Sequence, residues 1–127
     1  MLVVKASWFR FPRPTEVDLP AEEWEHGIHG GAVETAMMMH LRPALVRGGA
    51  LGDARSLGVE LGESLVRVAP EGSASFSWLS GDLHVSGVVG DATHANPRLG
   101  SELVRHYGGV LAEVIKDARA FPLDRLV

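Results

Sequence analysis

The strongest structural signal in this chain is a helical repeat of apolar residues near its C-terminus. Asn96 is a preferred N-cap residue, Pro97 suits the first helical position, and Pro122 predicts where the helix stops. The pair Gly108–Gly109 lowers the helix propensity in the middle, by roughly 1 kcal/mol each, and predicts close packing against a neighbour. The apolar face must be buried against another element. It consists of Leu99, Leu103, Tyr107, Val110, Leu111, Val114 and Ile115.

A second helix is predicted from about Gly31 to Val46. Its core stripe recurs every fourth residue, with Met38 and Ala44 beside it. Pro43 lies inside this span, so we expect a kink or an early end near Leu41. The stripe itself is Val33, Met37, Leu41 and Leu45.

The remaining segments favour an α/β fold in a single domain, residues 1–127, with a mostly parallel sheet and two main helices. The consecutive apolar residues Leu2, Val3 and Val4 predict a strand covered on both faces. Loops are expected at 10–23 and 47–55, and a turn-rich loop at Gly87–Thr93. Further strands are predicted, from weaker alternation, at Leu57–Leu61, Ser64–Val68 and Ala74–Leu79.

Composition excludes several classes of protein. The formal net charge is −4 and the arginines are scattered, so no basic stripe indicates nucleic-acid binding. No apolar run approaches the roughly 18 residues that would cross a membrane. The N-terminus lacks the pattern of a secretory signal, and the absence of cysteine removes disulfides, thiolate ligands and cysteine nucleophiles. We therefore expect a cytoplasmic protein.

His29, two glycines and Glu34 gather at the start of the second predicted helix. On one continuous helix the two side chains would diverge by about 140°. They converge only if His29 lies in the preceding loop, which Gly30–Gly31 permits. The helix dipole there favours a carboxylate and a neutral imidazole, the form that binds metal or accepts a proton. The alternative is that Glu34 caps the helix and His29 is a surface residue.

Four further residues are candidates for the site, again with a structural role as the alternative. They are Trp8, Trp24, Glu25 and His26. His26 and His29 form a His-x-x-His pair that could chelate a metal, although such a pair in a loop is a weak signal. Trp24, next to Glu25, could line a pocket or pack onto the following helix. Trp8 follows the first predicted strand, where α/β sheets place ligands, or it lies at the edge of the core. Among the other histidines, His40 and His106 are expected to be solvated or hydrogen-bonded, and His84 and His94 have no preferred role.

Two blocks of sequence resemble the creatininase family of amidohydrolases. His29–Met38, followed by Leu41–Val46, is similar to the family's His-Ala-Gly, two variable residues, Glu-Thr-Ser, then Leu-Arg-Pro-x-Leu-Val. Gly87–Ala95 is similar to its Gly-Val-x-Gly-Asp-Pro-Thr-x-Ala stretch. The resemblance covers nearly all of the chain. Gly30 replaces the usual Ala, and Ala36 replaces the usual Ser.

The resemblance implies the C-terminal half of a three-layer creatininase-like fold. Family members are about twice as long and bind their metals largely through an N-terminal Glu-x-His-Gly segment and a central Asn-Gly-His-Gly-Gly-Asn loop, both missing here. A divalent metal, zinc or manganese, would therefore be held mostly by residues absent from this chain. The chain would begin just past the central loop, either as a short gene or as a truncated record.

The resemblance also implies roles for individual residues. His29 would contact substrate and shuttle protons, and Glu34 would bind or orient the metal pair. Trp8 and Trp24 would be aromatic walls of the substrate site, with Glu25 and His26 beside them. The reaction would be hydrolysis of a C–N bond in a small cyclic amide.

The missing metal ligands imply that the chain has a protein partner. We expect the chain alone to be inactive or nearly so, and to form a homo-oligomer or to bind a complementing N-terminal half. The alternatives are a split-enzyme subunit, or a non-catalytic remnant that binds or oligomerises through an exposed sheet edge and the Trp8–Pro14 loop.

Overall fold

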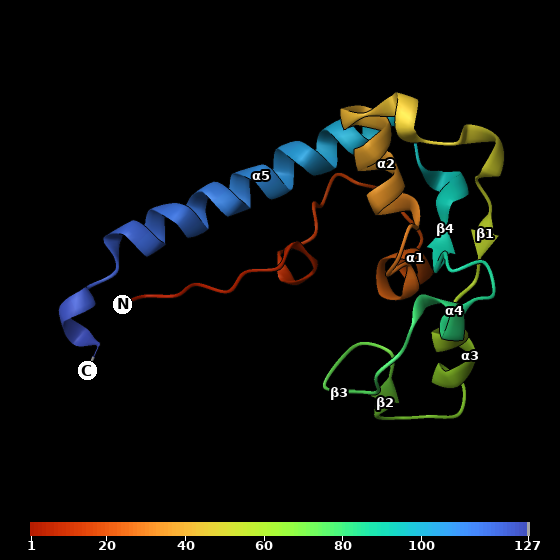
Figure 1. Ribbon diagram of the computed structural model, residues 1–127, viewed down its shortest axis with the longest axis horizontal. Coiled ribbons are helices and arrows are strands. Elements are labelled where there is room, and N and C mark those ends of the chain that lie inside the picture. The colour runs from red at the N-terminus through yellow and green to blue at the C-terminus, as the bar shows by residue number, and fades with distance from the viewer. Residues whose placement is uncertain (127) are drawn as a thin grey trace.

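The computed structural model describes residues 1–126 and is a mixed α/β structure (Figure 1). The helices are α1 (Ala21–His26), α2 (Ala32–Leu41), α3 (Leu57–Gly62), α4 (Ser80–Leu83) and α5 (Pro97–Ala120). The strands are β1 (Asp53–Ala54), β2 (Val68–Ala69), β3 (Ala74–Ser75) and β4 (Gly90–Asp91). β1 pairs with β4 in antiparallel fashion, and β2 pairs with β3 in parallel. Within the described residues, no helix combines the length and apolar character of a membrane span.

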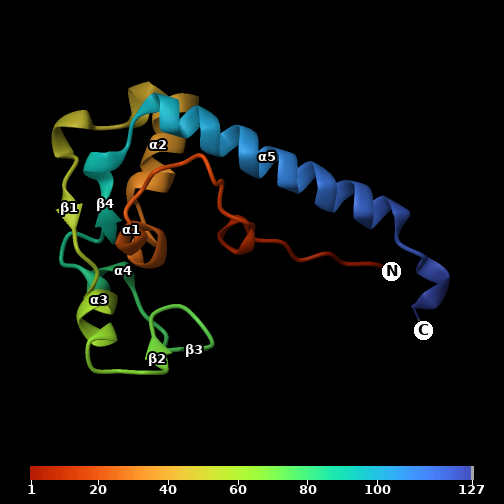
Figure 2. The same ribbon diagram turned by 180° about the vertical axis from the view of Figure 1, so that it is seen from behind.

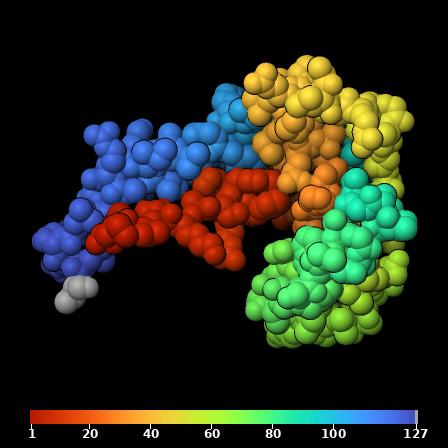
Figure 3. Space-filling view, viewed as in Figure 1, coloured from red at the N-terminus to blue at the C-terminus, as the bar shows by residue number. Residues whose placement is uncertain are grey.

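α5 extends well beyond the packed body of the molecule, and the N-terminal segment runs beside it (Figures 1 and 2). The space-filling view shows the two in direct contact (Figure 3). Trp8 packs on Tyr107, with ring centroids 5.2 Å apart, and the His106 Nε2 atom lies 2.7 Å from the Pro12 carbonyl oxygen. His106 is thus hydrogen-bonded, as predicted.

The helix predicted at the C-terminal end is confirmed, but only the first half of its predicted apolar face is buried. Leu111 and Ile115 are 46% and 54% exposed. The Asn96 side-chain Oδ1 accepts the Leu99 backbone N–H at 2.9 Å, and α5 stops at Ala120, two residues before Pro122. Leu103 is fully buried against α2. The predicted close packing of Gly108–Gly109 is wrong, because among the described residues nothing lies within 4 Å of a Cβ placed at either position.

The close approach to α2 is made instead by Gly100. A Cβ at this position would overlap the backbone carbonyl of Ala36. The buried face of α2 is correspondingly small, because it presents Ala32, Val33 and Ala36 to the core. Small side chains on both helices let the two backbones come together.

The early end of α2 near Leu41 is confirmed, and Pro43 begins a short 3₁₀ turn, Pro43–Leu45. The predicted core stripe is wrong in its second half, since Leu41 and Leu45 are 55% and 71% exposed. Because the helix ends at Leu41, Leu45 no longer continues the buried face. Val33 is buried as predicted, and Met37 packs against the core from a half-buried position.

All four strand predictions are wrong or too long. Residues 2–4 are in no strand, and Val3 and Val4 are 75% and 50% exposed, so no strand precedes Trp8. Leu57–Leu61 lies in α3, because the Ser56 hydroxyl accepts the Gly58 N–H at 3.0 Å and caps a helix there. Of 64–68 and 74–79, only Val68 and Ala74–Ser75 are in strands. The described residues therefore form two separate two-stranded sheets in place of the mostly parallel sheet that we predicted.

Candidate functional site

The backbone around His29 is held at the N-terminus of α2. His29 and Val89 form an antiparallel bridge in which His29 N–H donates to Val89 O (3.2 Å) and Val89 N–H donates to His29 O (2.7 Å). Gly30 then has a φ of 68°, a left-handed conformation that glycine adopts without strain. The Gly30 N–H donates to the Glu34 carboxylate, and the Thr35 hydroxyl donates to the Gly30 carbonyl at 3.0 Å. His29 is therefore in the loop and Glu34 in the first turn, as the sequence predicts.

Glu34 faces a cavity of about 440 Å³, which is within the range of small-molecule sites. The cavity lies between the first turns of α2 and two segments that are distant in sequence, 45–54 and 84–92. His29 is exposed and does not line it. The hydrogen bond from Gly30 N–H to Glu34 agrees with the alternative in which Glu34 is a cap. The Glu34 carboxylate also lies at a cavity. The lining of this cavity includes Thr35, Met38, Arg47, Asp53, His84, Ser86 and Val88.

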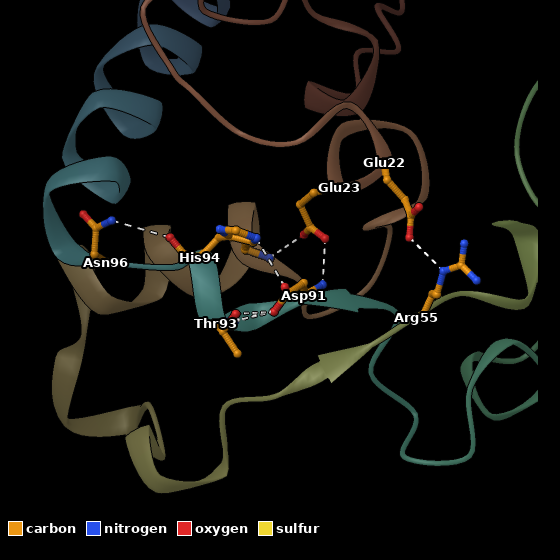
Figure 4. A network of polar contacts seen from close by, with 8 residues as sticks. Glu22, Glu23, Arg55, Asp91, Thr93, His94 and Asn96 are labelled. Carbon is orange, nitrogen blue, oxygen red and sulfur yellow. Dashed lines mark hydrogen bonds and ion pairs between the residues drawn. The ribbon is translucent and has the colours of Figure 1, made fainter.

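The most buried carboxylate at the N-terminus of α2 belongs to Glu23 of α1. The loop expected at 10–23 is therefore wrong at its end, where α1 begins at Ala21. Glu23 is 5% exposed and joins α1 to α2 and β4 (Figure 4). Its Oε1 atom accepts the Ala32 N–H at 2.6 Å, and its Oε2 atom accepts the Asp91 N–H at 2.7 Å. Since Gly31 at the N-cap has no side chain, Glu23 caps α2 from another helix.

Glycines surround the Glu23 carboxylate. A Cβ at Gly27 or Gly31 would overlap it, and a Cβ at Gly90 would lie 3.0 Å from both carboxylate oxygens. Gly90 also has a φ of 136°. The signal for Glu23 was Pro20 followed by acidic residues, a helix start that places Glu23 one turn before Gly27.

The two candidate tryptophans, Trp8 and Trp24, lie outside the main cavity. Trp24 packs against the core, its carbonyl accepts a hydrogen bond from the Arg13 guanidinium at 2.9 Å, and the guanidinium carbon of Arg13 lies 5.3 Å from the ring centroid. Trp8 stacks on Phe9 and packs against the core. These contacts agree with the alternatives in which the two tryptophans have a packing role. A substrate-binding role for either tryptophan stays a prediction.

Glu25 and His26 also lie apart from the main cavity. Glu25 is exposed, and His26 is half-buried. His26 lines a smaller cavity of about 200 Å³ together with Glu23, Arg55 and Asp91. His29 is not part of that lining, so the two histidines do not share a cavity.

Asp91, which begins the short 3₁₀ turn Ala92–His94, carries a perturbed carboxylate (Figure 4). Burial acts to raise its pKa. Two groups of Thr93, its hydroxyl and its backbone N–H, donate to Asp91 Oδ1. Together with the nearby His94, these donors outweigh burial and lower the Asp91 pKa overall. His94 Nε2 lies 3.3 Å from Asp91 Oδ2. This carboxylate is therefore held in its charged form.

The residues that the structure describes do not by themselves fit a metal ion. Among residues 1–126, no three His, Asp or Glu side chains are grouped closely enough to hold one. A metal needs at least three protein ligands in the usual catalytic sites. The resemblance assigns one metal ligand, Glu34, to this chain. That assignment stays a prediction.

These features define a mixed α/β protein with a carboxylate at a ligand-sized cavity beside a helix N-terminus. The chain belongs to the creatininase family, because the family profile, described as creatinine amidohydrolase, matches residues 1–115. No curated protein and no solved structure matches the chain.

Proposed function

We propose that this chain is the C-terminal half of a creatininase-like amidohydrolase that hydrolyses a C–N bond in a small cyclic amide. The observation that carries the proposal is Glu34, a residue of the family motif, at a cavity of about 440 Å³. The matched family is described as creatinine amidohydrolase, so creatinine is the first substrate to test.

Within this chain, Glu34 would accept hydrogen bonds from the N–H groups of the amide. One of its oxygens accepts the Gly30 N–H, and a carboxylate has further lone pairs for a ligand. His29 would move the proton during ring opening. Its backbone is fixed by Val89, but it does not line the cavity, so its exposed side chain would have to turn toward the substrate. Trp8, Trp24, Glu25 and His26 would reach the substrate only if a partner extended the site toward them.

The missing part of the site would come from outside these 127 residues. Any zinc or manganese ion would be held mostly by that part, since the residues described here do not fit a metal on their own. The source would be a complementing N-terminal half or another copy in a homo-oligomer.

An alternative is a non-catalytic remnant that only binds or oligomerises. The observation that favours it is the exposed apolar surface of the N-terminal segment and of the outer half of α5. Val3 is 75% exposed, Leu111 is 46% exposed and Ile115 is 54% exposed. Both sheets are two-stranded, so each of their strands is an edge, and Phe11 of the Trp8–Pro14 loop packs against the core.

The test is an assay of creatinine ring opening with zinc or manganese. We expect no turnover by the purified chain, turnover after mixing with a polypeptide that carries the family's N-terminal half, and loss of that turnover in Glu34→Gln. Turnover by the chain alone that His29→Ala abolishes would show that the site is already complete. A mixture that forms a complex and takes up metal but stays inactive would favour the non-catalytic alternative. A stable monomer without metal uptake would exclude both the split enzyme and the non-catalytic remnant.

A further inference from the structure

His84 lies on the wall of the cavity that contains Glu34, although no motif in the sequence gives it a role. It follows α4 directly and begins the segment that leads through Ser86 and Val88 to β4. Ser86 and Val88 line the same cavity. The segment therefore brings a histidine to a cavity that already has a carboxylate.

The hydrogen bonds of this segment determine which ring nitrogen carries the proton. The Ser86 backbone N–H donates to His84 Nδ1 at 3.2 Å. A backbone N–H can only donate, so Nδ1 is the acceptor and the neutral ring has its proton on Nε2. The Ser86 Oγ atom accepts the Val88 N–H at 3.2 Å and lies 2.7 Å from His84 Nδ1. The hydroxyl proton is thus free to donate to Nδ1 as well, which fixes both the tautomer and the ring orientation.

The lining of the cavity also includes the charged side chains of Arg47 and Asp53. Among its polar groups, His84 and Glu34 form one pair of donor and acceptor. His84 Nε2–H is the donor, and the Glu34 carboxylate is an acceptor that uses one oxygen for Gly30. Met38 and Val88 provide apolar surface in the same lining. This pattern matches a small cyclic amide, which has an N–H, a carbonyl oxygen and a hydrocarbon part.

We propose that His84 is a substrate-binding residue that donates from Nε2–H to the carbonyl oxygen of a small cyclic amide whose N–H groups face Glu34. The inference rests on the proposed function, since it takes the cavity beside Glu34 as the amide site. It adds a residue outside both family-like motif blocks as the determinant of carbonyl recognition.

The experiment uses the purified chain, because the residues that line the cavity all belong to it. Long-range ¹H–¹⁵N NMR spectra report the tautomer of His84, and titration with creatinine gives its Kd. We expect the Nε2–H tautomer in the free protein and a shift of the His84 Nε2 signal on binding. His84→Leu should raise the Kd by about five- to tenfold, the value of one neutral hydrogen bond.

Two further variants serve as controls. His84→Gln keeps an N–H donor at the end of the side chain and should restore most of the affinity. His40→Leu makes the same change at an exposed histidine that does not line the cavity, and should leave the Kd unchanged. Thermal unfolding of each variant shows whether it is folded, and His84→Gln decides the question if His84→Leu is not.

The proposal is overturned by an Nδ1–H tautomer, by equal Kd values in wild type and both His84 variants, or by a wild-type chain that binds no creatinine. The proposed function is judged separately. Hydrolysis by the completed enzyme with an unchanged KM in His84→Gln and His84→Leu would refute the role of His84 alone. Binding that depends on His84 in a completed enzyme that does not hydrolyse creatinine would refute the function alone.

Discussion

At the scale of single residues, Glu23 caps the N-terminus of α2 in place of an N-cap side chain. Its two oxygens satisfy the backbone N–H groups of Ala32 and Asp91, and it joins α1, α2 and β4 at one buried point. The loop that carries His29 and the first turn that carries Glu34 both start from this point. The geometry of the candidate site therefore depends on a residue that does not line the main cavity.

Replacing Glu23 should destabilise the fold. Glu23→Ala leaves two backbone donors without their partner, and we expect a loss of about 2–4 kcal/mol in the free energy of unfolding, measured by urea denaturation. Glu25→Ala on the same helix is the matched control, because Glu25 is exposed and should have no measurable effect. Equal stability of the two variants would contradict the capping role.

Asp91 should make stability depend on acid pH. Because its pKa is lowered in the folded state, its contribution is fully present above the pKa of the unfolded state, about 3.9, and is lost as the pH falls through the folded value. Thr93→Val removes the hydroxyl donor and should raise the Asp91 pKa toward its ordinary value, as followed by NMR titration. An unchanged Asp91 pKa in Thr93→Val would show that the hydroxyl is not a cause of the shift.

The sequence predicts the position of Glu34 and His29 better than that of Glu23. The Gly30–Gly31 pair and the dipole argument place the first two correctly, in a turn and a loop. The helix start after Pro20 predicts that Glu23 is helical, but it does not predict the partners of Glu23. These are backbone groups of residues 32 and 91, and the contact with Asp91 spans 68 positions, which leaves no local pattern.

At the scale of elements, the contact between α2 and α5 organises the body of the molecule. It depends on Gly100, where the helix comes too close to the Ala36 carbonyl for a side chain. The pair Gly108–Gly109, in the same helix, faces open space among the described residues. Two glycine positions of one helix thus have opposite consequences.

Substitutions in α5 test this difference. Gly100→Ala should destabilise the protein by at least about 2 kcal/mol, since the helices must move apart and lose packing. Gly108→Ala should instead stabilise it by about 0.5–1 kcal/mol, through the helix propensity of alanine. Both values come from denaturation curves, and a loss of similar size in both variants would refute the packing argument.

Helices with capping signals were predictable, and the short strands were not. Asn96–Pro97 and Pro43 fix one end each of α5 and α2, because a cap or a proline acts locally. The Ser56 cap carried the same kind of information and would have predicted α3. Strands of two residues, such as β1 and β4, are held by their partner across the sheet and have no period of their own to read.

At the scale of the whole molecule, the main cavity is a product of the tertiary fold. Its walls come from α2, from the chain between Leu45 and Ala54, and from the segment between His84 and Ala92. The motif around Glu34 predicts one wall. The other walls follow from the pairing of β1 with β4 and of His29 with Val89, which bring distant segments together.

The central claim is that Glu34 serves a ligand in addition to capping its own loop. Glu34→Gln separates the two roles, because the amide oxygen still accepts the Gly30 N–H while the negative charge is lost. The decisive measurement is creatinine binding to the wild-type chain and to Glu34→Gln, with the free energy of unfolding measured alongside. We predict nearly unchanged stability and at least a tenfold weaker Kd in the variant; unchanged binding would mean that Glu34 is a cap and no more.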